Sequence, residues 1–171
     1  KLLGKIADLR ATSHETLDVV AFQILRGAPA DDLAEAVQNA QAMQRALGHL
    51  RPTPREAGAW RPIAQALQHA LAKMTQSDAS METLRAAFEP LSEGVIQCLQ
   101  VFGNPTSTPL RVAHCPMAQG SAGASWVQRK GTIDNPYFGA AMLTCGAFRH
   151  VVDSGTHLMG ATKKTNPAPQ T

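Results

Sequence analysis

Residues 114–146 read HCPMAQGSAGASWVQRKGTIDNPYFGAAMLTCG, and the rest of the chain is organised around them. The stretch holds two of the three cysteines and two of the six methionines. Its possible metal ligands gather at its two ends: His114, Cys115, Met117, Met142 and Cys145. If the chain folds back on itself, four sulfurs and one imidazole meet. Thiolate and thioether ligands select soft metals, Cu(I) above all.

The spacing of these residues suits one site. Cys115 and Met117 alternate, so in an extended segment they point to the same side, and Pro116 between them stiffens the backbone. Met142 and Cys145 share a face if their segment is helical. Zinc is bound poorly by thioethers and usually comes with paired CxxC cysteines, which the sequence lacks. The metal that this pattern predicts is therefore Cu(I), with Ag(I) as its mimic.

Two other interpretations of the same residues stay open. A disulfide between Cys115 and Cys145 would close a loop of about 30 residues and contribute roughly 3.6 kcal/mol. Alternatively the sulfurs only fill space beside a small core of Trp126 and Tyr137. Enzymatic activity is not expected. His114 and Cys115 are neighbours that point apart in an extended run, so they do not form a nucleophile–base pair.

Four amphipathic helices are expected before this stretch. Their starts are marked by capping residues or by the first apolar position, and their ends by Gly or Pro. The expected starts are near Ser13, Asp32, Trp60 and Ser80. Short connections predict an antiparallel up-down bundle, a mainly α fold. Pro90 should kink or break the last helix, and Cys98 on its apolar stripe is interpreted as a buried, inert thiol.

The segment after the helices is expected to be small and irregular. Leu110 to Ala113 and Ser125 to Gln128 alternate like a short hairpin, and Tyr137 to Cys145 is a plausible short helix. The chain is thereby divided into residues 1–12 (an extension or the end of a preceding module), 13–104 (the bundle), 105–150 (the metal-binding segment) and 151–171 (a tail). The sequence assigns no role to His150, His157 or Met159.

Composition excludes several classes of protein. The net charge is +3 with basic residues scattered, which argues against a nucleic-acid partner. No run of about 18 apolar residues exists, so no membrane span is expected. Three cysteines argue against a disulfide scaffold. The chain begins at Lys1 without a signal-peptide pattern, and is expected to be a processed form or a fragment.

The motif in 114–146 resembles a known family. HCPMA, then GA-x-W-x-Q, then I-x-NPYFG-x-x-ML-x-CG look like a small helical domain of unknown function found in bacterial periplasmic proteins. That domain is also appended to adaptor subunits of RND-type copper/silver efflux pumps. The resemblance implies a periplasmic location, a role in copper delivery, sequestration or efflux, and an efflux adaptor or another periplasmic copper protein as partner. The alternative function is a module that binds no metal, holds a Cys115–Cys145 disulfide and docks an envelope partner.

Overall fold

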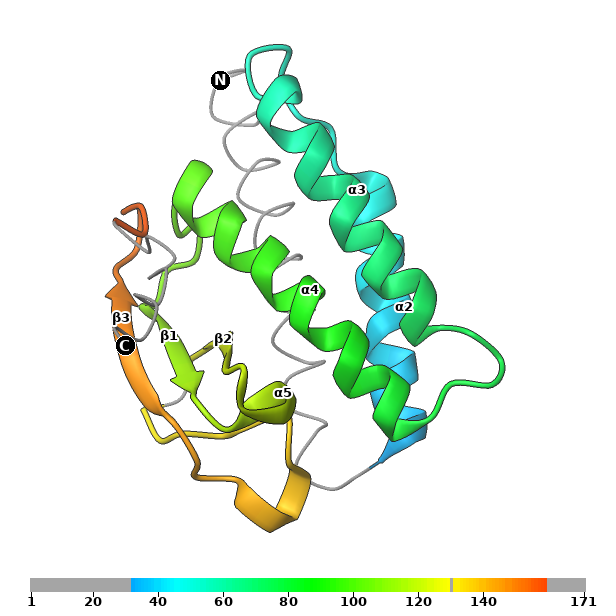
Figure 1. Ribbon diagram of the computed structural model, residues 1–171. Helices are drawn as coiled ribbons and strands as arrows, with labels where there is room; N and C mark the ends of the chain where they lie inside the picture. The colour runs from blue at the N-terminus through cyan, green and yellow to red at the C-terminus, as the bar shows by residue number, and fades with distance from the viewer. Residues whose placement is uncertain (1–31, 130, 160–171) are drawn as a thin grey trace, which may run out of the picture.

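The computed structural model describes residues 32–129 and 131–159. Three long helices come first, followed by a small sheet with two short turns of helix (Figure 1). The elements are α2 (Leu33–His49), α3 (Ala57–Met74), α4 (Met81–Val101), β1 (Leu110–Cys115), α5 (Ala118–Ser121), β2 (Ala124–Gln128), the 3-10 turn η2 (Gly139–Met142) and β3 (Ala147–Val152). α4 lies in the middle, with α3 and α2 on one side and the sheet on the other.

The helices begin where capping residues predict them. Asp32 accepts a hydrogen bond from the amide of Glu35, and Ser80 forms a reciprocal capping box with Thr83. These bonds satisfy amide groups that have no partner inside a helix. Three of the four predicted helices are thus confirmed. The helix expected after Ser13 and the extension 1–12 lie outside the described residues, so the four-helix bundle stays a prediction.

α4 is one helix of 21 residues that runs through Pro90 without the break that the sequence allowed. The ring of Pro90 is exposed, so it does not disturb the core. Four residues further along, Gly94 is buried against Leu67 of α3. A Cβ at Gly94 would stand 2.6 Å from Leu67 Cδ2, so the missing side chain is what lets the two helices approach closely.

The sheet has the antiparallel order β2-β1-β3. The predicted hairpin is confirmed as β1 and β2. β3 was not predicted, and it runs across the boundary drawn between residues 150 and 151; Val152 in it and Leu158 beyond it are buried. The helix expected from Tyr137 to Cys145 is only the four-residue turn η2.

Both faces of the sheet contribute to the core. One face places Ala113, Cys115 and Trp126 in the main core with the helices. The other face forms a smaller cluster around Leu99 of α4. No helix within the described ranges is long and apolar enough to cross a membrane.

Candidate functional site

Cys115 and Cys145 are brought together from positions 30 residues apart. Cys115 is the last residue of β1 and is 0% exposed, whereas Cys145 lies between η2 and β3 and is half-buried. Their Sγ atoms are 2.7 Å apart, with one thiol donating a hydrogen bond to the other. This bond is the main reason that the pKa of Cys145 is raised, and burial adds to it. The predicted meeting of the two cysteines is therefore what the structure shows.

Asn135 fixes the backbone that carries Cys145. Its side-chain amide donates to the Cys145 carbonyl at 2.7 Å, and its own backbone amide donates to the Leu143 carbonyl at 2.7 Å. Its Oδ1 accepts from the amide of Tyr137 at 2.8 Å. Asn135 is 1% exposed, so these bonds are shielded from water. Asn135 thus holds the loop that carries Cys145.

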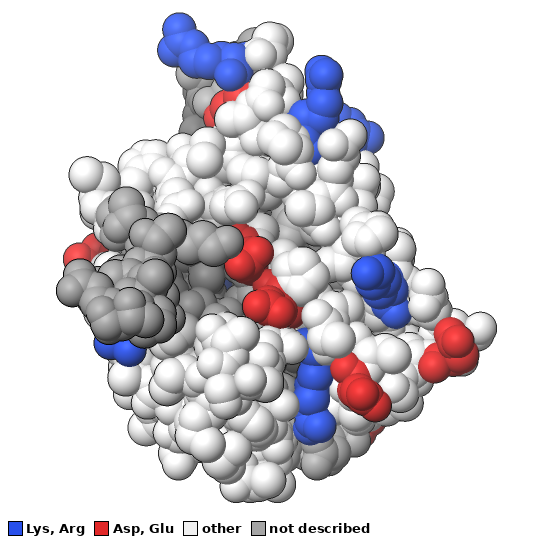
Figure 2. Space-filling view, viewed as in Figure 1, with Lys and Arg blue, Asp and Glu red and all other residues white. Residues whose placement is uncertain are grey.

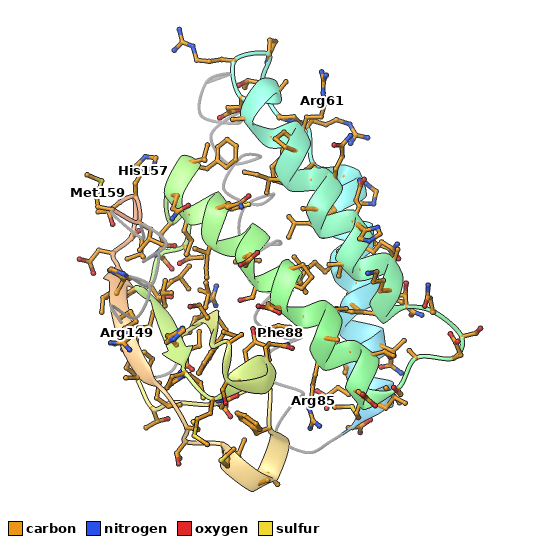
Figure 3. All side chains as sticks on the ribbon, viewed as in Figure 1. Arg61, Arg85, Phe88, Arg149, His157 and Met159 are labelled. Atoms are coloured by element: carbon orange, nitrogen blue, oxygen red, sulfur yellow. The ribbon has the colours of Figure 1, made fainter. Side chains whose placement is uncertain are left out.

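Three aromatic side chains form a wall beside the thiol pair. Tyr137 contacts Phe88 of α4 and Trp126 of β2 edge-on, with ring centroids 5.4 and 6.1 Å apart. Phe88 extends from α4 toward the C-terminal segment (Figure 3). The Trp126 Nε1–H donates to the Gln128 side chain at 2.8 Å, which satisfies a buried donor. The wall joins α4 to the loop that carries Cys145.

Gly146 explains why the chain can pass so close to this wall. Its φ is +133°, and a Cβ there would lie 2.9 Å from Trp126 Cη2 and 3.0 Å from the His114 carbonyl oxygen. Only glycine meets both conditions without displacing a neighbour. Since Gly146 directly follows Cys145, this close contact helps to set where the second sulfur lies.

His114 does not join the thiol pair. Within the described residues, no group of three or more His, Cys, Asp or Glu side chains is placed to hold a metal. Adjacent residues of a strand point to opposite faces, and the ring of His114 hydrogen-bonds to Ser125 Oγ at 3.1 Å. Burial lowers the pKa of His114, and the positive charge of Arg149 adds to the shift. The expectation that His114 is a further ligand has no support in this geometry.

The two methionines differ in their surroundings. Met117 is 52% exposed and immediately precedes α5. Met142 is half-buried at the end of η2, and its carbonyl accepts a hydrogen bond from the Cys145 amide. Both thioethers thus belong to segments that adjoin a cysteine. Residues Gln119 to Ser121 after Met117 all have φ above +50°, a left-handed turn that the sequence did not predict.

The sulfur and imidazole side chains of Met159, His157 and Cys98 are found in other segments of the chain. Met159 is 82% exposed, and it lies with His157 beyond the end of β3 (Figure 3). The His157 ring contacts the Gln100 carbonyl of α4. Cys98 is partly buried against the main core, as expected of a packing residue.

Charged side chains are scattered over the face of the molecule shown in Figure 2. On the face shown in Figure 2, basic and acidic side chains are scattered among uncharged ones, and much of the surface over the C-terminal segment is uncharged. The view shows no basic stripe of the kind that follows a nucleic-acid backbone.

Comparison with protein families found one match. Residues 29–107 match the family described as "Protein of unknown function (DUF3347)". The matched residues include α2, α3 and α4 and end before β1, so the match does not reach the cysteine motif. Comparison with curated proteins and with solved structures found no match. The helical part of the chain is therefore similar to an uncharacterised family of helical domains.

Proposed function

We propose that this protein binds Cu(I), with Ag(I) as a mimic, through the thiolates of Cys115 and Cys145, and that it acts in copper delivery, sequestration or efflux. The observation that carries the proposal is the convergence of two thiols, from distant parts of the chain, at a sulfur separation of 2.7 Å. Met117 and Met142 are the proposed thioether ligands, because each adjoins one of the two cysteines in sequence.

The donor set favours a soft ion over zinc. Structural zinc sites use four Cys or His ligands and catalytic ones at least three, whereas the described residues offer no group of three such side chains. Cu(I) accepts two thiolates, and thioethers add to its coordination. Two cysteines with two nearby methionines are therefore a poorer match for zinc than for Cu(I).

Metal binding requires the sulfur of one of the two cysteines to move slightly. With the zinc–thiolate distance of about 2.3 Å and a tetrahedral angle taken as a guide, two sulfurs on one metal ion would lie roughly 3.8 Å apart, which exceeds the 2.7 Å seen between the thiols. The side chain of Cys145 is the one able to move, by rotating about its Cα–Cβ bond, since it is half-buried while Asn135 holds its backbone. Cys115 is fixed in β1 by pairing with Ala124.

The setting in the bacterial periplasm is part of the proposal and comes from the motif resemblance in residues 114–146. The same resemblance names the proposed partners, an efflux adaptor subunit or another periplasmic copper protein. The competing function is a docking module without metal, in which Cys115 and Cys145 form a disulfide. The proximity of the two sulfurs favours this competitor as much as it favours metal.

An anaerobic titration separates the two functions. The fully reduced protein is titrated with Cu(I) against a competing chelator, and X-ray absorption reports the ligand shell. We expect one tight site with a shell dominated by sulfur. Failure of the reduced protein to compete with the chelator, or a shell of nitrogen and oxygen only, would contradict the proposal and favour docking.

Variants identify the ligands. Cys115→Ala and Cys145→Ala should each abolish tight binding while the far-UV circular dichroism of the helices is unchanged. Cys98→Ala is the matched control, because it removes a thiol that packs against the core and is expected to leave binding intact. A Cys115→Ala protein that binds one copper as tightly as the parent would refute the assignment. Met117→Leu and Met142→Leu should weaken binding without abolishing it, since the thiolates remain.

A further inference from the structure

We infer that Cys115 and Cys145 form a reversible dithiol–disulfide pair with unequal roles: Cys145 attacks an external disulfide, Cys115 resolves the product, and the internal disulfide then prevents metal binding. The exchange chemistry stands without any metal. The last clause rests on the proposed function and deepens it by giving the metal site a redox control.

The roles follow from accessibility. Thiol–disulfide exchange requires one thiolate to reach a sulfur of the other molecule. Cys145 is half-buried in the segment between η2 and β3, whereas Cys115 is 0% exposed in the core face of the sheet. An external disulfide therefore meets Cys145 first, and Cys115 is shielded from it.

The resolving step follows from proximity. Sγ of Cys115 lies 2.7 Å from Sγ of Cys145, so the second thiol is already beside the sulfur that it must attack. Asn135 holds the Cys145 carbonyl, and Gly146 lies against the His114 carbonyl, which keeps the two backbones close. An intramolecular attack from this arrangement outcompetes attack by a second molecule in dilute solution.

The reaction balances with a disulfide of low molecular mass, or the disulfide of an oxidoreductase, as oxidant. The Cys145 thiolate bonds to one sulfur of the oxidant and the other sulfur leaves as a thiolate. The Cys115 thiolate then bonds to Cys145 Sγ, and the second half of the oxidant leaves as a thiolate. The two protons from the protein thiols end on the two leaving thiolates, the protein loses two electrons, and the oxidant gains them.

Oxidation should prevent metal binding, because sulfur electrons that form the disulfide bond no longer give the thiolates that bind the metal. The thiolate is the metal ligand, and sulfurs joined to each other no longer carry that charge. The donors left near the pair are then the thioethers of Met117 and Met142, which are neutral.

The test of the roles uses metal-free, fully reduced protein and oxidised glutathione, with products measured by intact mass and peptide mapping. In Cys115→Ser, we expect a stable mixed disulfide of glutathione on Cys145. In Cys145→Ser, Cys115 should stay unmodified over the same time. The parent and the Cys98→Ser control should pass to an internal disulfide and lose two hydrogens without retaining glutathione.

Three outcomes would overturn the assignment of roles. They are an adduct on Cys115 as fast as on Cys145, no adduct on Cys145 in Cys115→Ser, or a parent that retains glutathione on Cys145; peptide mapping separates these from any adduct on Cys98. Urea-unfolded Cys145→Ser serves as the positive control, because unfolding exposes Cys115 and should permit its modification.

The predicted loss of metal binding on oxidation is tested with Ag(I), whose binding needs no reductant. Oxidised parent should lose the Ag(I) binding seen with the reduced parent, and treatment with a phosphine reductant, removed before titration, should restore it. Equal Ag(I) binding before and after oxidation would overturn the redox control. The reduced parent could confirm the exchange roles and yet bind neither Ag(I) nor Cu(I). The proposed function and the redox control of metal binding would then both be wrong, while the roles of Cys145 and Cys115 in disulfide exchange would stand.

Discussion

Replacing Asn135 with Ala should destabilise the protein and loosen the thiol pair together. The side chain makes one buried bond, from the Tyr137 amide to its Oδ1, and one partly buried bond, from its own amide to the Cys145 carbonyl. Each contributes about 1 kcal/mol net, and leaving the two peptide groups buried without partners adds about as much again, so the total loss is about 2–4 kcal/mol. This corresponds to a fall in Tm of roughly 5–15 °C.

The assay is urea unfolding followed by far-UV circular dichroism, together with the Cu(I) competition titration of the folded variant. Asn104→Ala is the matched control. Asn104 is also buried, and it donates to the Thr108 and Val152 carbonyls, away from the cysteine loop. Because Asn104 Oδ1 also accepts from the amide and the hydroxyl of Thr106, we expect Asn104→Ala to lose at least as much stability as Asn135→Ala, while only Asn135→Ala alters Cu(I) affinity.

Two results would refute this reasoning. A loss below about 0.5 kcal/mol would mean that water or a shifted backbone replaces the bonds of Asn135. Equal changes in Cu(I) affinity for the two variants would mean that general destabilisation, and not the hold on Cys145, governs the site.

Three further predictions concern the helices, each measured by urea unfolding. Gly94→Ala should lower stability by about 1 kcal/mol, because crowding Leu67 outweighs the gain in helix propensity; a more stable variant would contradict the close packing. Ser80→Ala should cost about 1 kcal/mol through loss of the cap, and no change would mean that the cap is not needed. Burial raises the pKa of Glu89, and the negative charge of Glu93 raises it further. The folded state therefore favours protonated Glu89, and the stability that this preference contributes is lost as pH rises through the folded-state pKa of Glu89. Glu89→Gln should therefore gain a few tenths of a kcal/mol at pH 7 and nothing below about pH 4, and a gain independent of pH would refute this cause.

The sequence alone predicted the parts of the molecule whose structure is set locally. Apolar residues at helical spacing and the caps Asp32 and Ser80 located α2 and α4, because a helix is stabilised by contacts within a few residues. Alternation located the β1–β2 hairpin for the same reason. The sulfur-bearing residues at the two ends of residues 114–146 suggested that Cys115 and Cys145 could meet if the chain folds back on itself.

The remaining features depend on contacts between distant residues. In β3, exposed residues alternate with half-buried ones, and the first fully buried residue is Val152. The strand is therefore identified by its pairing with β1. η2 replaces the expected helix from Tyr137 to Cys145, and the Leu143 carbonyl just after η2 accepts a hydrogen bond from the amide of Asn135 instead.

The composition of the candidate site was likewise decided by tertiary structure. Sequence proximity to Cys115 suggested His114 as a ligand, but the pleat of β1 turns its ring to the opposite face, toward Ser125. Which cysteine is shielded was likewise not predicted from the sequence. Burial of Cys115 and exposure of Cys145 arise because β1 packs on the helices while the segment after η2 stays at the surface. A sequence can thus specify which residues carry sulfur, but the packing of the sheet against the helices determines which sulfur meets the solvent.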